Sequence, residues 1–193
     1  EVRAIAKAQD LITADKKDSQ GLCFVGKVRL PEFLQQKLQP KQGDIIEIPN
    51  DWKGYAEFDM LRLFETYEDE LKYLSQRFVY QPEDGKKVGT HQGAHYFTKG
   101  QRKGLNVGGT KEPLFIIETD IEKNIIYTGQ GHTHRGLFRS ALFIATPDEH
   151  WIREDLALKV YESKEFMVRI RYRQTLQKAV LYKVKNGLYI HFS

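Results

Sequence analysis

The chain of 193 residues contains 40% hydrophobic, 29% charged and 12% aromatic residues. This composition is typical of a folded globular protein and excludes a mainly disordered or collagen-like chain. The longest uninterrupted apolar run, Ala141 to Ala145, is too short to span a bilayer, so we expect no membrane contact. A single cysteine, Cys23, excludes an internal disulfide and a cysteine-based metal cluster.

The net charge is only +4, but the charges are unevenly distributed along the chain. Residues 85–111 contain six Lys or Arg and no Asp or Glu, and the same is true of residues 169–185. Residues 51–84 contain nine acidic and four basic side chains. Two basic stretches without acidic residues favour a polyanionic partner, although each could equally form a solvated surface.

The first elements along the chain are short. Apolar spacing of three and four predicts a helix over residues 1–9. An apolar strand is predicted over residues 22–25, a helix over residues 31–38 and a further strand over residues 45–48.

The clearest predicted helix covers residues 55–80. Seven apolar side chains recur there at steps of three and four: Phe58, Leu61, Phe64, Tyr67, Leu71, Leu74 and Phe78. Because the segment is acidic, it is an unfavourable surface for nucleic acid, and we interpret it as an inserted helical arm.

The second half of the chain is predicted to be mostly antiparallel β-structure. Glycines recur from Gly85 to Gly109 and indicate tight turns. Strands are predicted over residues 114–118, 124–128, 142–145, 179–182 and 188–190. Alternation over residues 166–173 predicts a half-buried strand with Arg169, Arg171 and Arg173 on its outer face. The predicted fold class is therefore mainly β with a few helices (α+β), of sandwich or barrel type.

Cys23 is the first candidate for chemistry. Between Leu22 and Phe24 it fits a small core residue, which is a common place for a free cysteine. The nearby cations Lys16 and Lys17 would instead increase its thiolate fraction, as in a reactive thiol. The local sequence leaves both interpretations open.

Histidines and glycine-rich loops give weaker signals. The histidines include two close pairs, His91 with His95 and His132 with His134. Neither pair has the glutamate of the metalloprotease pattern, and no metal site is predicted. The glycine-rich segment 100–109 matches neither the Walker pattern nor the dinucleotide fingerprint, so no ATP site is predicted there. A basic loop without acidic residues can still hold a nucleic-acid backbone.

Several motifs, taken together, point to one family. In chain order they are residues 16–26, 89–93, 96–109, 131–132, Trp151 and residues 171–174. Residues 16–26 read KKDSQGLCFVG and residues 98–105 read TKGQRKGL. This ordered set resembles the bacterial tRNA-specific 2-thiouridylases, the MnmA/TrmU family, in which the first motif surrounds the second essential cysteine.

The resemblance implies a three-part protein: an ATP-binding PP-loop domain, a small central β-rich domain and a C-terminal antiparallel β-barrel. Residues 1–25 would be the end of the first part, residues 26–138 the central domain and residues 139–193 a barrel that is incomplete. The insertion near residues 55–80 departs from the family, where this connection is short. ATP with Mg²⁺ would be bound by a preceding domain, and the residues of this chain would bind no cofactor.

The implied reaction is 2-thiolation of the wobble uridine of tRNA in the cytoplasm. In the family, ATP adenylates the C2 oxygen and a cysteine persulfide supplies the sulfur. Cys23 would carry that persulfide, receive its sulfur from a sulfur-relay donor protein, and form a disulfide with a first cysteine upstream. Arg171, Tyr172 and Arg102 would contact the tRNA.

Two other functions remain open from the residues alone. The chain could be a non-catalytic RNA-binding β module in which Cys23 is a core residue. It could also be a thiol hydrolase that pairs Cys23 with a histidine, although no base or oxyanion element can be placed. Nothing in the sequence indicates a methyl-donor site.

Overall fold

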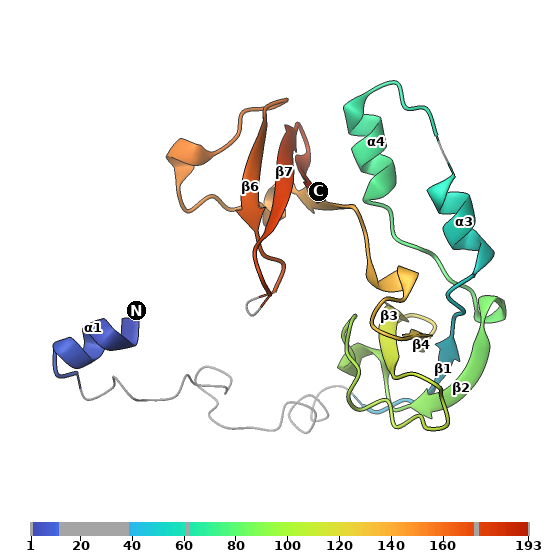
Figure 1. Ribbon diagram of the computed structural model, residues 1–193. Coiled ribbons are helices and arrows are strands. Elements are labelled where there is room, and N and C mark those ends of the chain that lie inside the picture. The colour runs from blue at the N-terminus through green and yellow to red at the C-terminus, as the bar shows by residue number, and fades with distance from the viewer. Residues whose placement is uncertain (1, 12–38, 61, 172–173, 193) are drawn as a thin grey trace. The chain divides into compact units, whose positions relative to one another are not determined.

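The chain divides into two compact units, Glu1–Pro40 and Lys41–Ser193. The computed structural model describes residues 2–11, 39–60, 62–171 and 174–192 (Figure 1). The first unit contains helix α1 (Val2–Ala8), which confirms the predicted N-terminal helix. The strand predicted over residues 22–25 and the helix predicted over residues 31–38 lie outside the described residues. No helix in the described part of the chain is long and apolar enough to cross a membrane.

The second unit contains two four-stranded sheets, and the first has the order β2-β1-β4-β3. Its strands are β1 (Gly43–Glu47), β2 (Lys86–His91), β3 (Leu114–Asp120) and β4 (Ile125–Gln130). β1 pairs antiparallel with β2, β3 pairs antiparallel with β4, and β1 pairs parallel with β4. Three of these strands match predicted ones, whereas β2 and the parallel pairing were not predicted.

Both faces of the first sheet are buried, and successive residues of β1 point to opposite faces and so contribute to both. Ile46 packs with Ile117 and Tyr127 on one face, and Ile45 packs with Ile116 and Ile126 on the other. Aromatic residues of the acidic segment cover the first face, and residues of the glycine-rich segment cover the second, among them Ala94 and Leu105. The sheet therefore holds the glycine-rich segment against its own core.

The acidic segment forms two helices rather than one. They are α3 (Lys53–Asp59) and α4 (Tyr67–Leu74), so the single helix predicted over residues 55–80 is wrong. A second helix begins because Thr66 caps it: Thr66 Oγ1 accepts a hydrogen bond of 3.1 Å from the Asp69 amide. Three acidic residues in the first turn of α4 also favour a helix N-terminus at this point.

Aromatic side chains tie the two helices to each other and to the first sheet. Tyr55 of α3 lies against Phe78, and its hydroxyl forms a 2.8 Å hydrogen bond with that of Tyr80. Burial raises the pKa of Tyr55 to about 12, which keeps this hydroxyl protonated. On α4, Tyr73 donates a hydrogen bond to the Phe58 carbonyl, and their rings stack at 4.6 Å.

The second sheet is antiparallel, with the order β5-β8-β7-β6. Its strands are β5 (Ala141–Ala145), β6 (Ser163–Val168), β7 (Gln177–Val184) and β8 (Gly187–Phe192). The prediction of a mainly β protein with few helices is confirmed. The expected barrel is not found within the described residues, because β5 and β6 lie at opposite edges and do not pair. The chain between them forms short 3-10 turns at Thr146–Asp148 and Glu154–Leu156.

Helix α4 covers one face of the second sheet. Leu71 of α4 is fully buried with Ala141, Val184 and Tyr189. At the start of the helix, the Tyr67 hydroxyl lies 3.0 Å from His191 Nδ1. Because α3 packs on the first sheet and α4 on the second, the acidic segment connects the two sheets (Figure 1).

Replacing Leu71 with Ala tests this connection. The change removes a fully buried side chain and should lower the free energy of unfolding by about 3 kcal/mol. Urea denaturation followed by circular dichroism measures the loss. Lys72→Ala, on the exposed side of the same helix, is the matched control and should change stability by less than about 0.5 kcal/mol. Equal stabilities for the two variants would show that α4 does not contribute to the core.

Candidate functional site

The loop that contains Arg102 is held firmly against β3. The Gly100 amide donates to the Ile116 carbonyl at 2.7 Å, and the Ile116 amide donates to the Gln101 carbonyl at 3.0 Å. The Gln101 side chain closes the turn by donating to the Lys103 carbonyl at 2.7 Å. Arg102 and Lys103 therefore stand exposed on a loop whose backbone is fixed on both sides.

Arg171 reaches this loop from the segment between β6 and β7. Its Nη2 donates a hydrogen bond to the carbonyl of Lys99. Gly100, next to it, has φ +78°, and a Cβ there would lie 3.4 Å from Arg171 Nη1. Glycine at this position adopts the left-handed backbone without strain and leaves room for the guanidinium to approach closely. The contact joins the two basic stretches, one on each sheet, and at this joint Arg171 lies against the loop that carries Arg102.

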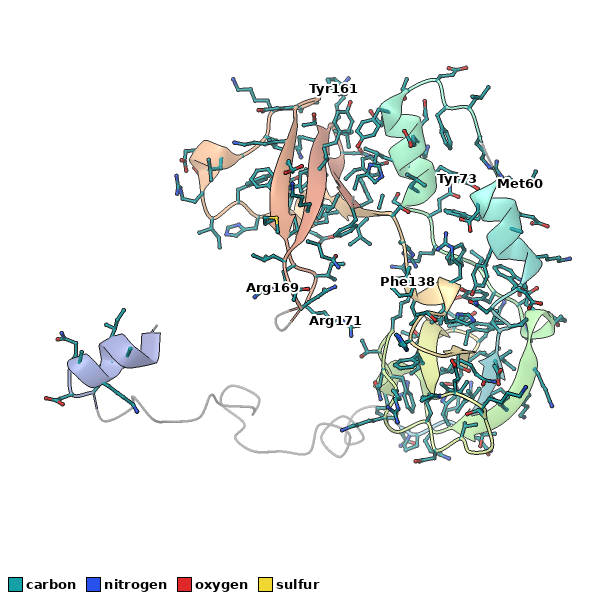
Figure 2. The ribbon with its side chains drawn as sticks, viewed as in Figure 1. Met60, Tyr73, Phe138, Tyr161, Arg169 and Arg171 are labelled. Carbon is teal, nitrogen blue, oxygen red and sulfur yellow. The ribbon has the colours of Figure 1, made fainter. Side chains whose placement is uncertain are left out.

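Arg169 and Arg171 do not lie on a strand face as predicted, and Arg173 lies outside the described residues. β6 ends at Val168, because its partner β7 begins at Gln177, directly opposite. Arg169 and Arg171 follow the strand in a bend and lie beyond its end (Figure 2). The predicted alternation holds up to Val168, where Phe166 and Val168 pack inward and Met167 is exposed.

A hollow of about 950 Å³ opens beside the edge strand β2. Its lining combines three lysines and the backbone of a glycine turn with three carboxylates: Lys86, Lys87, Lys111, Gly108, Gly109, Glu47, Glu83 and Asp84. One of these lysines, Lys87, is already paired with Asp44 at 2.7 Å. The hollow is therefore close to neutral and is a poorer site for a polyanion than the loop around Arg102.

One histidine of each close pair, His91 and His134, is buried and serves the fold. His91 Nδ1 accepts a hydrogen bond of 2.9 Å from the Gly93 amide. His134 Nδ1 accepts from the Gly136 amide at 3.2 Å, so its Nε2 carries the proton and donates to the Ile48 carbonyl at 3.1 Å. The described residues contain no group of three or more His, Cys, Asp or Glu that could hold a metal ion.

Two of the predicted site residues, Cys23 and Tyr172, lie outside the described residues. The roles of Cys23, Arg171, Tyr172 and Arg102 remain predictions. The structure places Arg171 against the loop of Arg102, which spacing in the sequence could not show.

Comparisons with known proteins identify the family. A model described as the tRNA methyl transferase PRC-barrel domain matches residues 69–130, and one described as the tRNA methyl transferase HUP domain matches residues 1–27. The whole chain is 58% identical to the tRNA-specific 2-thiouridylase MnmA of Christiangramia forsetii and 59% identical to that of Flavobacterium johnsoniae. The MnmA of Halalkalibacterium halodurans is 36% identical over 97% of the chain. The chain belongs to the tRNA-specific 2-thiouridylase family.

The chain spans about half the length of the 2-thiouridylases it matches: 48% of the first two and 40% of the third. Family membership confirms the resemblance read from the ordered motifs. The family models carry the description of a methyl transferase, whereas these relatives are named as thiouridylases.

Sequence patterns did not predict one group of side chains. Lys99, Glu118 and Arg139 meet near the Arg171 contact, with Lys99 Nζ bonded to Glu118 Oε2 and Arg139 Nη2 at 3.9 Å from the same oxygen. They come from separate elements, so no spacing pattern connects them. The one available signal was Glu118, a carboxylate directly after the apolar run of β3.

The buried histidines predict how stability depends on pH. Burial lowers the pKa of His134 and of His91 below the ordinary value of 6.5. The unfolded chain therefore takes up protons first, and stability falls as the pH drops below about 6.5. The urea midpoint should decrease between about pH 7.5 and about pH 5.5, and less so in His134→Gln. The exposed His132→Gln is the control and should keep the wild-type pH dependence. A pH dependence that is unchanged in His134→Gln would contradict this account.

Proposed function

We propose that this protein takes part in 2-thiolation of tRNA, replacing the C2 oxygen of a uridine with sulfur. Family membership supports this reaction, because the relatives are named as tRNA-specific 2-thiouridylases. The observation that carries the proposal for this chain is the Arg171 contact with Lys99. The contact joins residues 72 positions apart in the sequence and so brings the two basic stretches into one surface that suits an RNA backbone.

In this proposal Arg171, Tyr172 and Arg102 hold the tRNA, and Cys23 carries the sulfur. Arg102 is exposed on a fixed loop, as a residue that binds a large external ligand must be. Cys23 would bind the sulfur as a persulfide, since a thiolate is the nucleophile that accepts sulfur from a donor. A sulfur-relay protein would load Cys23.

ATP does not fit the described residues. The family is ATP-dependent, and we expected ATP with Mg²⁺ outside this part of the protein. The hollow beside β2 has no excess of positive charge to hold a triphosphate, because Glu47, Glu83 and Asp84 balance its three lysines. The turn at Gly108–Gly109 lacks the Walker spacing of a phosphate loop. We therefore assign ATP binding to none of these residues.

Replacing Cys23 with Ser in the intact protein tests the sulfur-carrying role. We expect 2-thiouridine to disappear from cellular tRNA, because a hydroxyl cannot carry a persulfide. Mass spectrometry of tRNA nucleosides measures the modification, and a filter-binding assay should show unchanged tRNA affinity. Ser19→Ala, in the same segment, is the control and should leave thiolation intact. Normal thiolation in Cys23→Ser would favour the alternative function, a non-catalytic RNA-binding module with Cys23 as a core residue.

Arg171→Gln tests the RNA surface separately. The change removes one charge from the joint, and tRNA affinity should fall several-fold with a shallower salt dependence. Arg153→Gln removes the same charge from an exposed pair with Asp155 and should have little effect. Equal affinities of the two variants would remove Arg171 from the tRNA surface.

A further inference from the structure

At the joint between the two sheets, several positively charged side chains lie near a single carboxylate, that of Glu118. Glu118 is largely buried, with 14% of its side chain exposed, and it faces Lys99 and Arg139. Arg77, in the segment after α4, lies close enough to repel both of these cations. Within the described part of the chain Arg77 makes no salt bridge. Lys99 and Arg139 therefore share a single carboxylate, with the positive charge of Arg77 close to both of them. The guanidinium of Arg171 is bonded to the backbone carbonyl of Lys99.

This excess of positive charge is costly in the free protein. Burial, together with the mutual repulsion of Arg139, Arg77 and Lys99, lowers the pKa of Lys99, even though Glu118 opposes the shift. The pKa of Arg139 is lowered in the same way, first by burial and then by Arg77. Partly buried cations are stabilised when an anion joins them. The cluster is thus arranged to bind a further negative charge.

We propose that Arg77, Lys99 and Arg139 form a phosphate-binding site for the tRNA backbone, with Glu118 as its internal counter-charge. The proposal rests on the proposed function and extends its surface from Arg171 to three further side chains. An RNA phosphate suits the site because Lys99 and Arg139 stay partly open, with 36% and 22% of their side chains exposed.

The surroundings of the cluster favour RNA over a small anion. Arg171, on the neighbouring loop, can contact the next phosphate of a continuous backbone. Phe138, in the same connecting segment as Arg139, is 53% exposed, and an exposed aromatic ring can stack on an unpaired base. No small anion would use both features.

The test measures tRNA binding by the intact protein over a range of salt concentrations. A tRNA transcript with a wobble uridine is the probe, and the variants are Arg77→Gln, Arg139→Gln, Glu118→Gln and the control Arg153→Gln. Losing one phosphate contact should weaken binding roughly three- to fivefold and reduce the slope of log K against log salt by about one. We expect this of Arg77→Gln and Arg139→Gln, but not of Arg153→Gln.

Glu118→Gln gives a prediction of opposite sign. It keeps the shape of the side chain but frees Lys99 and Arg139, so tRNA should bind more tightly and with a steeper salt dependence. A purely structural cluster would lose stability without any gain in affinity. Thermal unfolding identifies variants whose folding is altered. Because Arg77 is exposed, Arg77→Gln is the variant whose folding should change least.

The outcomes separate this proposal from the proposed function. If the wild-type protein does not bind tRNA, both are wrong. If the wild type binds and Arg77→Gln, Arg139→Gln and Glu118→Gln all match Arg153→Gln, the phosphate site alone is wrong. If inorganic phosphate at constant ionic strength raises the unfolding temperature while the variants bind tRNA normally, the cluster binds a free anion and not RNA.

Discussion

The central strand β1 is buried on both faces, and the first sheet therefore needs two covers. Ile46 requires the aromatic cover that α3 and its neighbouring segment supply, and Ile45 requires the glycine-rich segment with Leu105. A loop that covers a core cannot move freely, because its apolar side chains would leave cavities behind. The exposed Arg102 is thus carried by a loop that core packing holds in place, which is the condition for a preorganised binding surface.

Local patterns predicted local structure well. Strands β3, β4, β5, β7 and β8 follow runs of apolar residues bounded by turns. The prediction of a single helix over residues 55–80 was wrong, because the apolar residues of two helices and an extended segment together repeat with a period near 3.6 residues. This period does not show where one helix ends and the next begins, whereas the capping residue Thr66 does. The strand predicted up to residue 173 failed because alternation describes one chain and cannot show where its partner begins.

The candidate site was predictable only in part. Motifs located Arg102 and Arg171 in the sequence, but their approach depends on a contact between two sheets. The Lys99, Glu118 and Arg139 group comes from a loop, a strand and a connecting segment, so only tertiary structure brings it together. Charge counts favoured a negatively charged partner, since one basic stretch contains Lys99 and Arg102 and the other contains Arg171. They could not show that the acidic insertion contributes a cation, Arg77, to the same place.

Helix α4 belongs by sequence to the first half of the second unit, yet it completes the core of the second sheet. Tyr67 and His191, which lie 124 residues apart, meet at its first turn. On the ribosome α4 therefore emerges long before the strands it covers, and its apolar face stays without its full set of partners until β5, β7 and β8 are made. Contacts of such long range slow folding, since a large loop must close before they form. Consequently, the core of the second sheet cannot form until β8 has left the ribosome.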